Sequence, residues 1–134
     1  MNKIERFEDI IAWQKARILT REVYAATKNG AFARDFGLKG QIQRASVSSM
    51  ANIAEGFERG GDKEFIQFLS NAKGSSGEVK SHLYVALDQE YVSSSAFDSL
   101  YGKADEVSRR IGGFMAYLNE SQLHGSKFKQ IAVL

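Results

Sequence analysis

The sequence predicts an all-α protein, built as an antiparallel up-down four-helix bundle. Apolar residues recur at alternating spacings of three and four over long segments, which is the pattern of a helix packed lengthwise against its neighbours. The chain contains no proline, so no proline ring interrupts a long helix. No strand-like alternation and no internal repeat is present. The 134 residues suit a single domain over residues 1–134.

The first helix is expected over about residues 8–28, where Asn29-Gly30 ends it. Its core stripe consists of Ile10, Trp13, Ala16, Thr20, Val23 and Thr27. The second helix is expected over about residues 37–59. Residues 45–54 of that helix are small or apolar on every side, which predicts contacts on most of its faces.

The third helix is expected over about residues 62–90, with Asp62 as its N-cap. Its core seam is Phe65, Leu69, Ala72, Ser76, Val79, Leu83 and Ala86. The fourth helix is expected over about residues 95–120, and serines 93–95 suit its start. Its seam is Phe97, Leu100, Ala104, Val107, Ile111, Phe114 and Leu118. Residues 121–134 lose the periodicity, so a loose tail is expected there.

Composition limits where the protein can work in the cell and which side-chain chemistry it can use. The net charge is only +2, and there is no cysteine, which removes disulfides, thiolate chemistry and cysteine-based zinc sites. The N-terminus is charged and lacks the apolar segment of a signal peptide. The longest charge-free stretch, Ala45 to Ala54, has ten residues, too few to span a bilayer as a helix. A cytoplasmic protein without a membrane segment is expected.

The residues give no sign of an enzyme, so no catalytic residue and no cofactor is predicted. A di-metal bundle needs Glu-x-x-His pairs on two helices. Here Glu78 and His82 are four residues apart, and the other histidine, His124, falls in the expected tail. No metal site is predicted either.

A row of cations on the first helix is the strongest candidate for a nucleic-acid surface. Lys39 and Arg44 of the second helix add to it. Alternatively, the cations of the first helix only complement its dipole, because acidic residues stand at its start. The candidate nucleic-acid residues are Arg17, Arg21, Tyr24, Lys28, Lys39 and Arg44.

Two glycine pairs interrupt the third and fourth helices on positions away from the core seams. Each glycine costs about 1 kcal/mol relative to alanine. Either the surface tolerates weak helix formers, or another helix approaches closely there, from a second subunit. The candidate interface residues are Gly74, Ser75, Gly77, Glu78, Gly112 and Gly113.

Asn52, Glu55 and Arg59 lie on adjacent turns of the second helix, where Glu55 and Arg59 are spaced for an ion pair. They are interpreted as a structural polar anchor that ties this helix to its neighbours. A ligand site is the alternative.

Several segments resemble the four-helix bundle proteins first known as open reading frames within intervening sequences of bacterial 23S rRNA genes. Those segments are Phe7-Glu-Asp-Ile, Trp13-Gln-Lys-Ala, Gln41-Ile-Gln-Arg-Ala, Asn52-Ile-Ala-Glu-Gly-Phe-Glu-Arg59, Lys63-Glu-Phe-Ile-Gln-Phe-Leu69 and Ala72-Lys-Gly-Ser-Ser-Gly-Glu78.

The resemblance implies a homopentameric ring of four-helix bundles. It also implies kinship with the accessory variability proteins of diversity-generating retroelements, which work with a reverse transcriptase and bind nucleic acid. Two positions depart from the family pattern. Met50 replaces a common proline, which predicts a straighter second helix. Gln43 replaces a basic residue, which weakens the nucleic-acid interpretation.

Three functions stay open from the sequence. The first is a non-enzymatic, homo-oligomeric accessory or scaffold protein that binds RNA, DNA or a nucleoprotein partner. The second is a protein–protein assembly module. The third is a small-molecule binder that uses the bundle core or the ring lumen. The first leads because of the resemblance and the slight basic excess.

Overall fold

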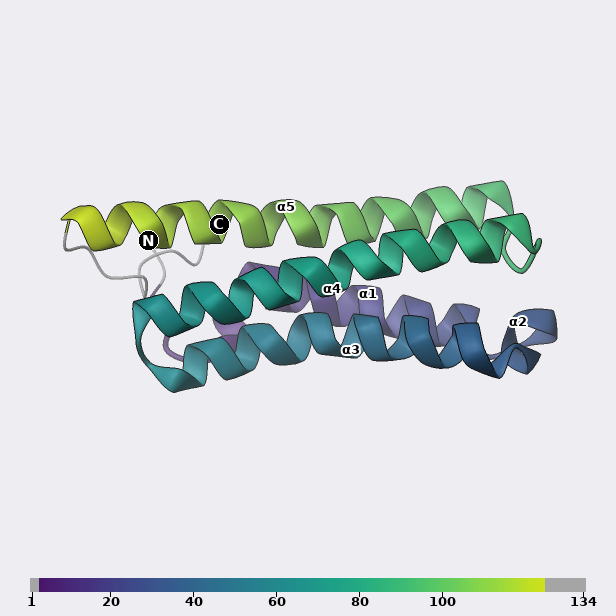
Figure 1. Cartoon of the computed structure of the whole chain (residues 1–134), viewed down its shortest axis with the longest axis horizontal. Coiled ribbons are helices and arrows are strands. Elements are labelled where there is room, and N and C mark those ends of the chain that lie inside the picture. Colours follow the sequence, from purple (N-terminus) through teal and green to yellow (C-terminus); the bar gives the residue numbers. More distant parts are fainter. Residues whose placement is uncertain (1–2, 125–134) are drawn as a thin grey trace.

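The computed structural model describes residues 3–124, which are helical almost throughout and contain no strand (Figure 1). A short 3₁₀ helix, Phe7–Asp9, precedes the others. The helices are α1 (Ile11–Ala26), α2 (Gly30–Arg34), α3 (Phe36–Arg59), α4 (Asp62–Asp88) and α5 (Ser94–His124). The all-α prediction is confirmed. None of these helices is both long and apolar enough to cross a membrane.

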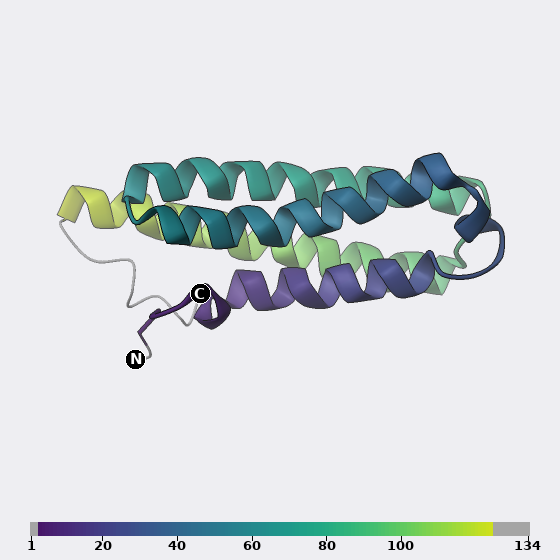
Figure 2. The same cartoon turned by 90° about the horizontal axis from the view of Figure 1, so that it is seen from below.

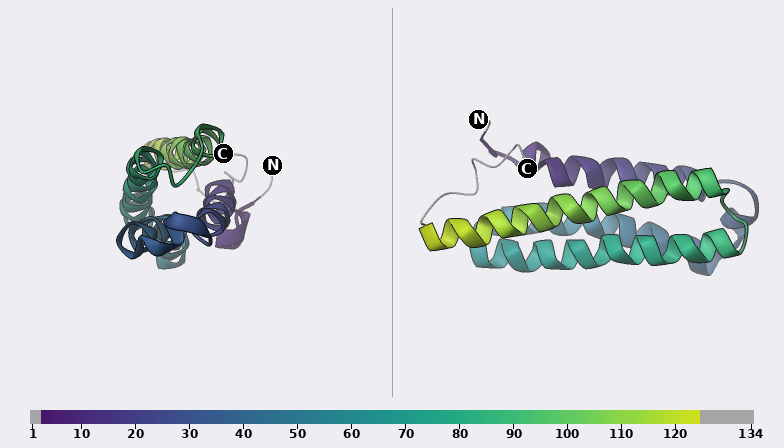
Figure 3. Two further views of the ribbon diagram at one scale, coloured as in Figure 1. Left: turned by 90° about the vertical axis from the view of Figure 1, so that its right-hand side faces the viewer. Right: turned by 90° about the horizontal axis from the view of Figure 1, so that it is seen from above.

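The four long helices form a square bundle in which sequential long helices are antiparallel (Figures 2 and 3). Helix α1 lies beside α3 and α5, and α4 lies beside the same two helices. Helices α1 and α4 therefore occupy opposite corners. The short helix α2 lies at the end of the bundle where α4 turns into α5.

The predicted seams form the core. All seven seam residues of α4 are buried, and so are six of the seven on α5, with Phe97 half-buried. In the core stripe predicted for the first helix, Trp13 and Thr20 are half-buried and the other four residues are buried. The three- and four-residue spacing therefore predicted the core residues of α1, α4 and α5 correctly.

Several helix ends differ from the sequence prediction. Asp9 accepts hydrogen bonds from the backbone N–H groups of Glu5 and Arg6, which favours a separate turn, so α1 begins at Ile11 instead of about residue 8. Helix α4 ends at Asp88 because Glu90 adopts a left-handed conformation, with φ of 61°. Helix α5 continues to His124, so residues 121–124 are helical, contrary to the expected tail. Residues 125–134 lie outside the described part.

Helix α2 was not predicted, and it closes one end of the core. Its Phe32 is buried and stacks on Tyr91 of the α4–α5 connection, with ring centroids 5.2 Å apart. Asp35 then caps α3 by accepting from the N–H of Leu38 at 3.0 Å. Its other carboxylate oxygen accepts from the Tyr91 hydroxyl at 2.9 Å, and this hydrogen bond raises the pKa of Tyr91. Asp35 thus caps the start of α3 and also holds the α4–α5 connection in place through Tyr91.

Gly56 of α3 is packed tightly against α4. A Cβ atom at this position would lie 2.7 Å from Cβ of Phe68 and 2.9 Å from Cδ1 of Phe65. Contacts that short do not occur between carbon atoms, and the Phe68 Cβ is fixed to its backbone. Any larger residue would therefore push the two helices apart.

We predict that Gly56→Ala lowers the free energy of unfolding by about 1–2 kcal/mol, since overpacking outweighs the gain in helix propensity. Gly102→Ala is the matched control, because Gly102 is a helical glycine whose added Cβ would meet nothing within 4 Å. The control should gain up to about 1 kcal/mol. Urea unfolding followed by circular dichroism measures both, and equal stability of the two variants would contradict the tight contact.

Candidate functional surfaces

The predicted basic row on α1 is an exposed stripe in the structure. Arg17, Arg21, Tyr24 and Lys28 follow one another at spacings of four, three and four, and all four are exposed. This spacing places Arg17, Arg21 and Tyr24 on one side of α1, and Lys28 continues the line two residues after the helix ends.

Helix α3 holds the side of α1 next to this stripe. The Thr20 hydroxyl donates to the carbonyl of Ser46 at 3.0 Å, and the Gln43 amide donates to the Thr27 hydroxyl at 2.9 Å. These bonds fix how α1 is rotated, so its stripe points outward beside α3. Gln43 thus serves as a structural link between α3 and α1.

The two basic candidates on α3, Lys39 and Arg44, lie on different sides of that helix. Lys39 stands one turn before Gln43, on the side of α3 that faces α1, and is half-buried. Arg44 instead lines a groove between α3 and α4. The structure therefore joins five of the six predicted residues into one surface, here called the α1–α3 face: Arg17, Arg21, Tyr24, Lys28 and Lys39.

Charge pairing differs sharply between the two halves of the bundle. Between residues 16 and 54 the sequence has six cations but only two carboxylates, Glu22 and Asp35. Within residues 3–120, none of those six cations makes an ion pair. Arg17 instead lies 5.9 Å from the ring centroid of Trp13. The positive charge of the α1–α3 face is thus not neutralised by the protein.

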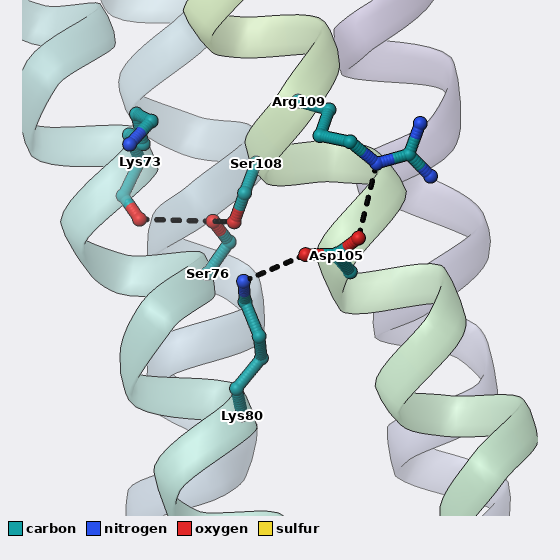
Figure 4. Close-up of polar contacts among 6 residues, drawn as sticks. All are labelled: Lys73, Ser76, Lys80, Asp105, Ser108 and Arg109. Atoms are coloured by element: carbon teal, nitrogen blue, oxygen red, sulfur yellow. Dashed lines mark hydrogen bonds and ion pairs between the residues drawn. The ribbon is translucent and has the colours of Figure 1, made fainter.

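Around α5, by contrast, carboxylates hold the cations (Figure 4). Asp105 accepts from Lys80 of α4 and from Arg109, each at 3.0 Å. The hydrogen bond from Lys80, followed by that from Arg109, lowers the pKa of Asp105. Glu106 lies 3.6 Å from both Lys15 and Arg110.

One turn along α5 from Asp105, the hydroxyls of Ser76 and Ser108 meet at 2.6 Å and join α4 to α5 in the core (Figure 4). Ser76 also donates to the carbonyl of Lys73. Both serines are buried, so each satisfies the other where water has no access.

An open groove of about 210 Å³ runs between α3 and α4. It was not predicted. Five of its lining residues are polar, and the side chains of Arg44, Glu78 and His82 make no hydrogen bond or ion pair within residues 3–120. The full lining is Gln41, Arg44, Ala45, Ser48, Glu78 and His82.

The predicted polar anchor works differently from the expectation. Asn52 donates to Ser48 within α3, and Glu55 and Arg59 form an exposed ion pair of 2.8 Å within the same helix. The link to α4 passes through Ser48, which accepts from Ser75 at 3.1 Å. Arg59 adds a second link, with its guanidinium 5.1 Å from the ring centroid of Phe68. Ser48 was not predicted, because nothing in the sequence distinguishes it from the neighbouring serines 46 and 49.

The predicted interface residues do not form one patch. Gly74 and Gly77 lie on the outermost line of α4, and an added Cβ at either would meet nothing within 4 Å. Ser75 and Glu78 turn toward α3. A Cβ atom added at Gly112 would lie 3.5 Å from Cε of Lys73 on α4, whereas Gly113 is exposed. Only the first pair is arranged to meet a single approaching helix.

Within residues 3–124, no three His, Cys, Asp or Glu side chains are grouped so that they could hold a metal ion. The structure defines a four-helix bundle with an unpaired basic face and a shallow polar groove.

The sequence profile of the 23S rRNA-intervening sequence proteins matches residues 8–113, and the chain belongs to that family. A crystal structure of a protein of unknown function from the S23 ribosomal protein family of Bacteroides thetaiotaomicron has the same fold. The TM-score is 0.71 at 20% identity, covering 78% of this chain and 97% of that one. No curated protein matches.

Asp105 should make stability depend on acidity. A carboxylate whose pKa is lower in the folded chain stabilises the fold above its unfolded pKa of about 3.9, and this contribution is lost as the pH falls through the folded pKa. Asp105→Asn should therefore be less stable at neutral pH and should lose less stability on acidification than the wild type. Thermal unfolding at several pH values measures this.

Asp98→Asn serves as the control on the same helix, because it leaves the Lys80–Asp105–Arg109 contacts intact. It should retain the acid-side loss of the wild type. If Asp105→Asn also kept that loss in full, the role given to Asp105 would be wrong.

Proposed function

We propose that the chain is a non-enzymatic, homo-oligomeric accessory protein that binds the phosphate backbone of nucleic acid. The observation that carries this proposal is the unpaired charge of the α1–α3 face. Cations without a carboxylate partner are free to contact phosphates, and each such contact releases counterions that are condensed on the nucleic acid. The resemblance to the accessory variability proteins supports the same partner.

The α1–α3 face also explains what kind of binding to expect. It offers backbone contacts from Arg17, Arg21, Lys28 and Lys39, and no structured set of amides or carboxylates that would read base edges. Phosphate contacts position a protein without selecting a sequence. Binding should therefore be indifferent to sequence and weak for a single subunit.

Self-association is the second part of the proposal. The outermost line of α4 consists of small, exposed residues, Ser70, Gly74, Gly77 and Ser81. Small residues let a partner helix approach closely, and such an approach would account for glycines inside a helix where each costs about 1 kcal/mol. The family resemblance favours a ring of five chains, or five times 14.9 kDa.

The α3–α4 groove favours a second candidate, a small-molecule binder. Arg44 and Glu78 carry opposite charges on its two walls, so a small molecule bearing both charges would fit its chemistry. Its open shape argues for low affinity, because a tight site buries most of the surface of its ligand. If nucleic acid does not bind, this groove and a protein–protein assembly role remain.

We expect sequence-independent binding of nucleic acid at about 50 mM salt that weakens steeply as salt rises, because bound cations release counterions. The double variant Arg17→Glu and Arg21→Glu should abolish this binding while the oligomeric state stays unchanged. Gel shifts with RNA, DNA and hybrid duplexes at several salt concentrations measure it.

The matched control is Lys63→Glu with Lys103→Glu, which changes the net charge by the same amount outside the α1–α3 face. Both lysines lie outside the ion pairs found within residues 3–120. Equal loss of binding in both double variants would show that only net charge matters. A wild-type protein that shows no shift at low salt would remove nucleic acid from the proposal.

Light scattering should give a mass of about 74.5 kDa, five times 14.9 kDa. Gly74→Leu or Gly77→Leu should dissociate the assembly while circular dichroism shows that helicity survives. Gly102→Leu is the control, since Gly102 is equally open on α5. A wild-type monomer at high micromolar concentration, or full assembly of the Gly74 and Gly77 variants, would overturn this part.

A further inference from the structure

Exposed rings stand among the unpaired cations of the α1–α3 face. Tyr24 is 41% exposed and lies between Arg21, three residues earlier, and Lys28, four residues later. On the adjoining side of α3, Phe36, Lys39 and Gln43 follow each other at spacings of three and four, and Gln43 reaches α1 through Thr27. Phe36 is 78% exposed. An exposed aromatic ring beside unpaired cations offers a flat face on which a nucleic-acid base can stack.

We infer that the α1–α3 face selects single-stranded over double-stranded nucleic acid, with Tyr24 and Phe36 as stacking platforms for unpaired bases. This inference rests on the proposed function and adds the form of nucleic acid that is bound. Proteins that hold single strands without sequence preference combine a row of cations with aromatic side chains on which bases stack. Both components are present on this face, on two helices whose relative position is fixed by hydrogen bonds.

The geometry of the row disfavours a duplex. Arg17 and Lys28 are eleven residues apart, with Lys28 two residues beyond the end of α1, so at the helical rise the row is about 16 Å long. Helix α1 stands at a corner of the square bundle (Figure 3), so a row along it is a narrow line of charge that suits one phosphate strand. In a duplex the bases are stacked on each other, so a ring beside this row finds no base face unless a base is flipped out at a cost. A single strand offers both phosphates and free base faces.

The test compares oligo(dT), oligo(U) and a mixed-sequence duplex, each of about 12 residues per strand, at about 50 mM salt. Fluorescence anisotropy gives the affinities. Trp13 is the only tryptophan and lies under Arg17, so its emission reports binding at this face. Single strands should bind at least about fivefold tighter than the duplex, which is the lower end of what one stacked base contributes. The two oligonucleotides separate DNA from RNA.

Tyr24→Ala and Phe36→Ala should each weaken single-strand binding about fivefold or more and leave duplex binding within about twofold. Tyr24→Phe should keep the single-strand affinity, because the ring alone stacks. Tyr84→Ala is the matched control: Tyr84 is 52% exposed on α4, away from the α1–α3 face, and its loss should change neither affinity.

The outcomes distinguish this inference from the proposed function. If the duplex binds as tightly as the single strands, or if Tyr24→Ala and Phe36→Ala bind like the wild type, stacking is refuted while backbone binding stands. If neither form binds at low salt, both are refuted.

Discussion

Helices α3 and α4 can lie as close together as they do only because residue 56 carries no side chain. At that point Phe65 of α4 occupies the space a Cβ would need, and its ring reaches Phe57 of α3 and Phe114 of α5, with centroids 6.1 and 5.2 Å away. Farther along, the same closeness lets the short hydroxyls of Ser48 and Ser75 meet. This seam fixes α3, α4 and α5 together, and α1 then completes the square against α3 and α5.

The polar contacts that join the helices explain which cations are left without a carboxylate partner. The α1–α3 seam is closed by hydroxyls and an amide, from Thr20, Thr27 and Gln43, and it needs no carboxylate. The α5 seams instead use Asp105 and Glu106, which reach cations on α4, α1 and α5 itself. Asp105 and Glu106 thus neutralise cations around α5, while the cations of the α1–α3 face have no carboxylate partner within residues 3–120. The basic face is a consequence of how the helices are joined, since the net charge of +2 would not predict it.

The sequence predicted the core well because buried residues recur with the helical period. That period is visible in the three- and four-residue spacing of apolar residues such as Leu69, Val79 and Ile111. It predicted the helix ends less well. Helix α2 has five residues, too few to show a period, and its role depends on Tyr91, which is 59 residues away from Phe32. The positions of the polar side chains were hardest to predict. Spacing shows which side of a helix a residue lies on, but not which other helix packs against that side. For this reason Arg44 was assigned to the wrong surface, and the groove was missed.

The two proposed activities occupy surfaces that do not compete. Helix α4, whose outer line would meet another subunit, stands at the corner opposite α1, so assembly through α4 leaves the α1–α3 face open. Each face offers few phosphate contacts, and a single subunit would lose most of its affinity at physiological salt. In a closed ring the same face recurs once per subunit, and one flexible strand could engage several copies at an effective concentration far above that in solution. A stiff duplex bends too little to follow such a ring, so assembly and the stacking platforms would favour the same partner.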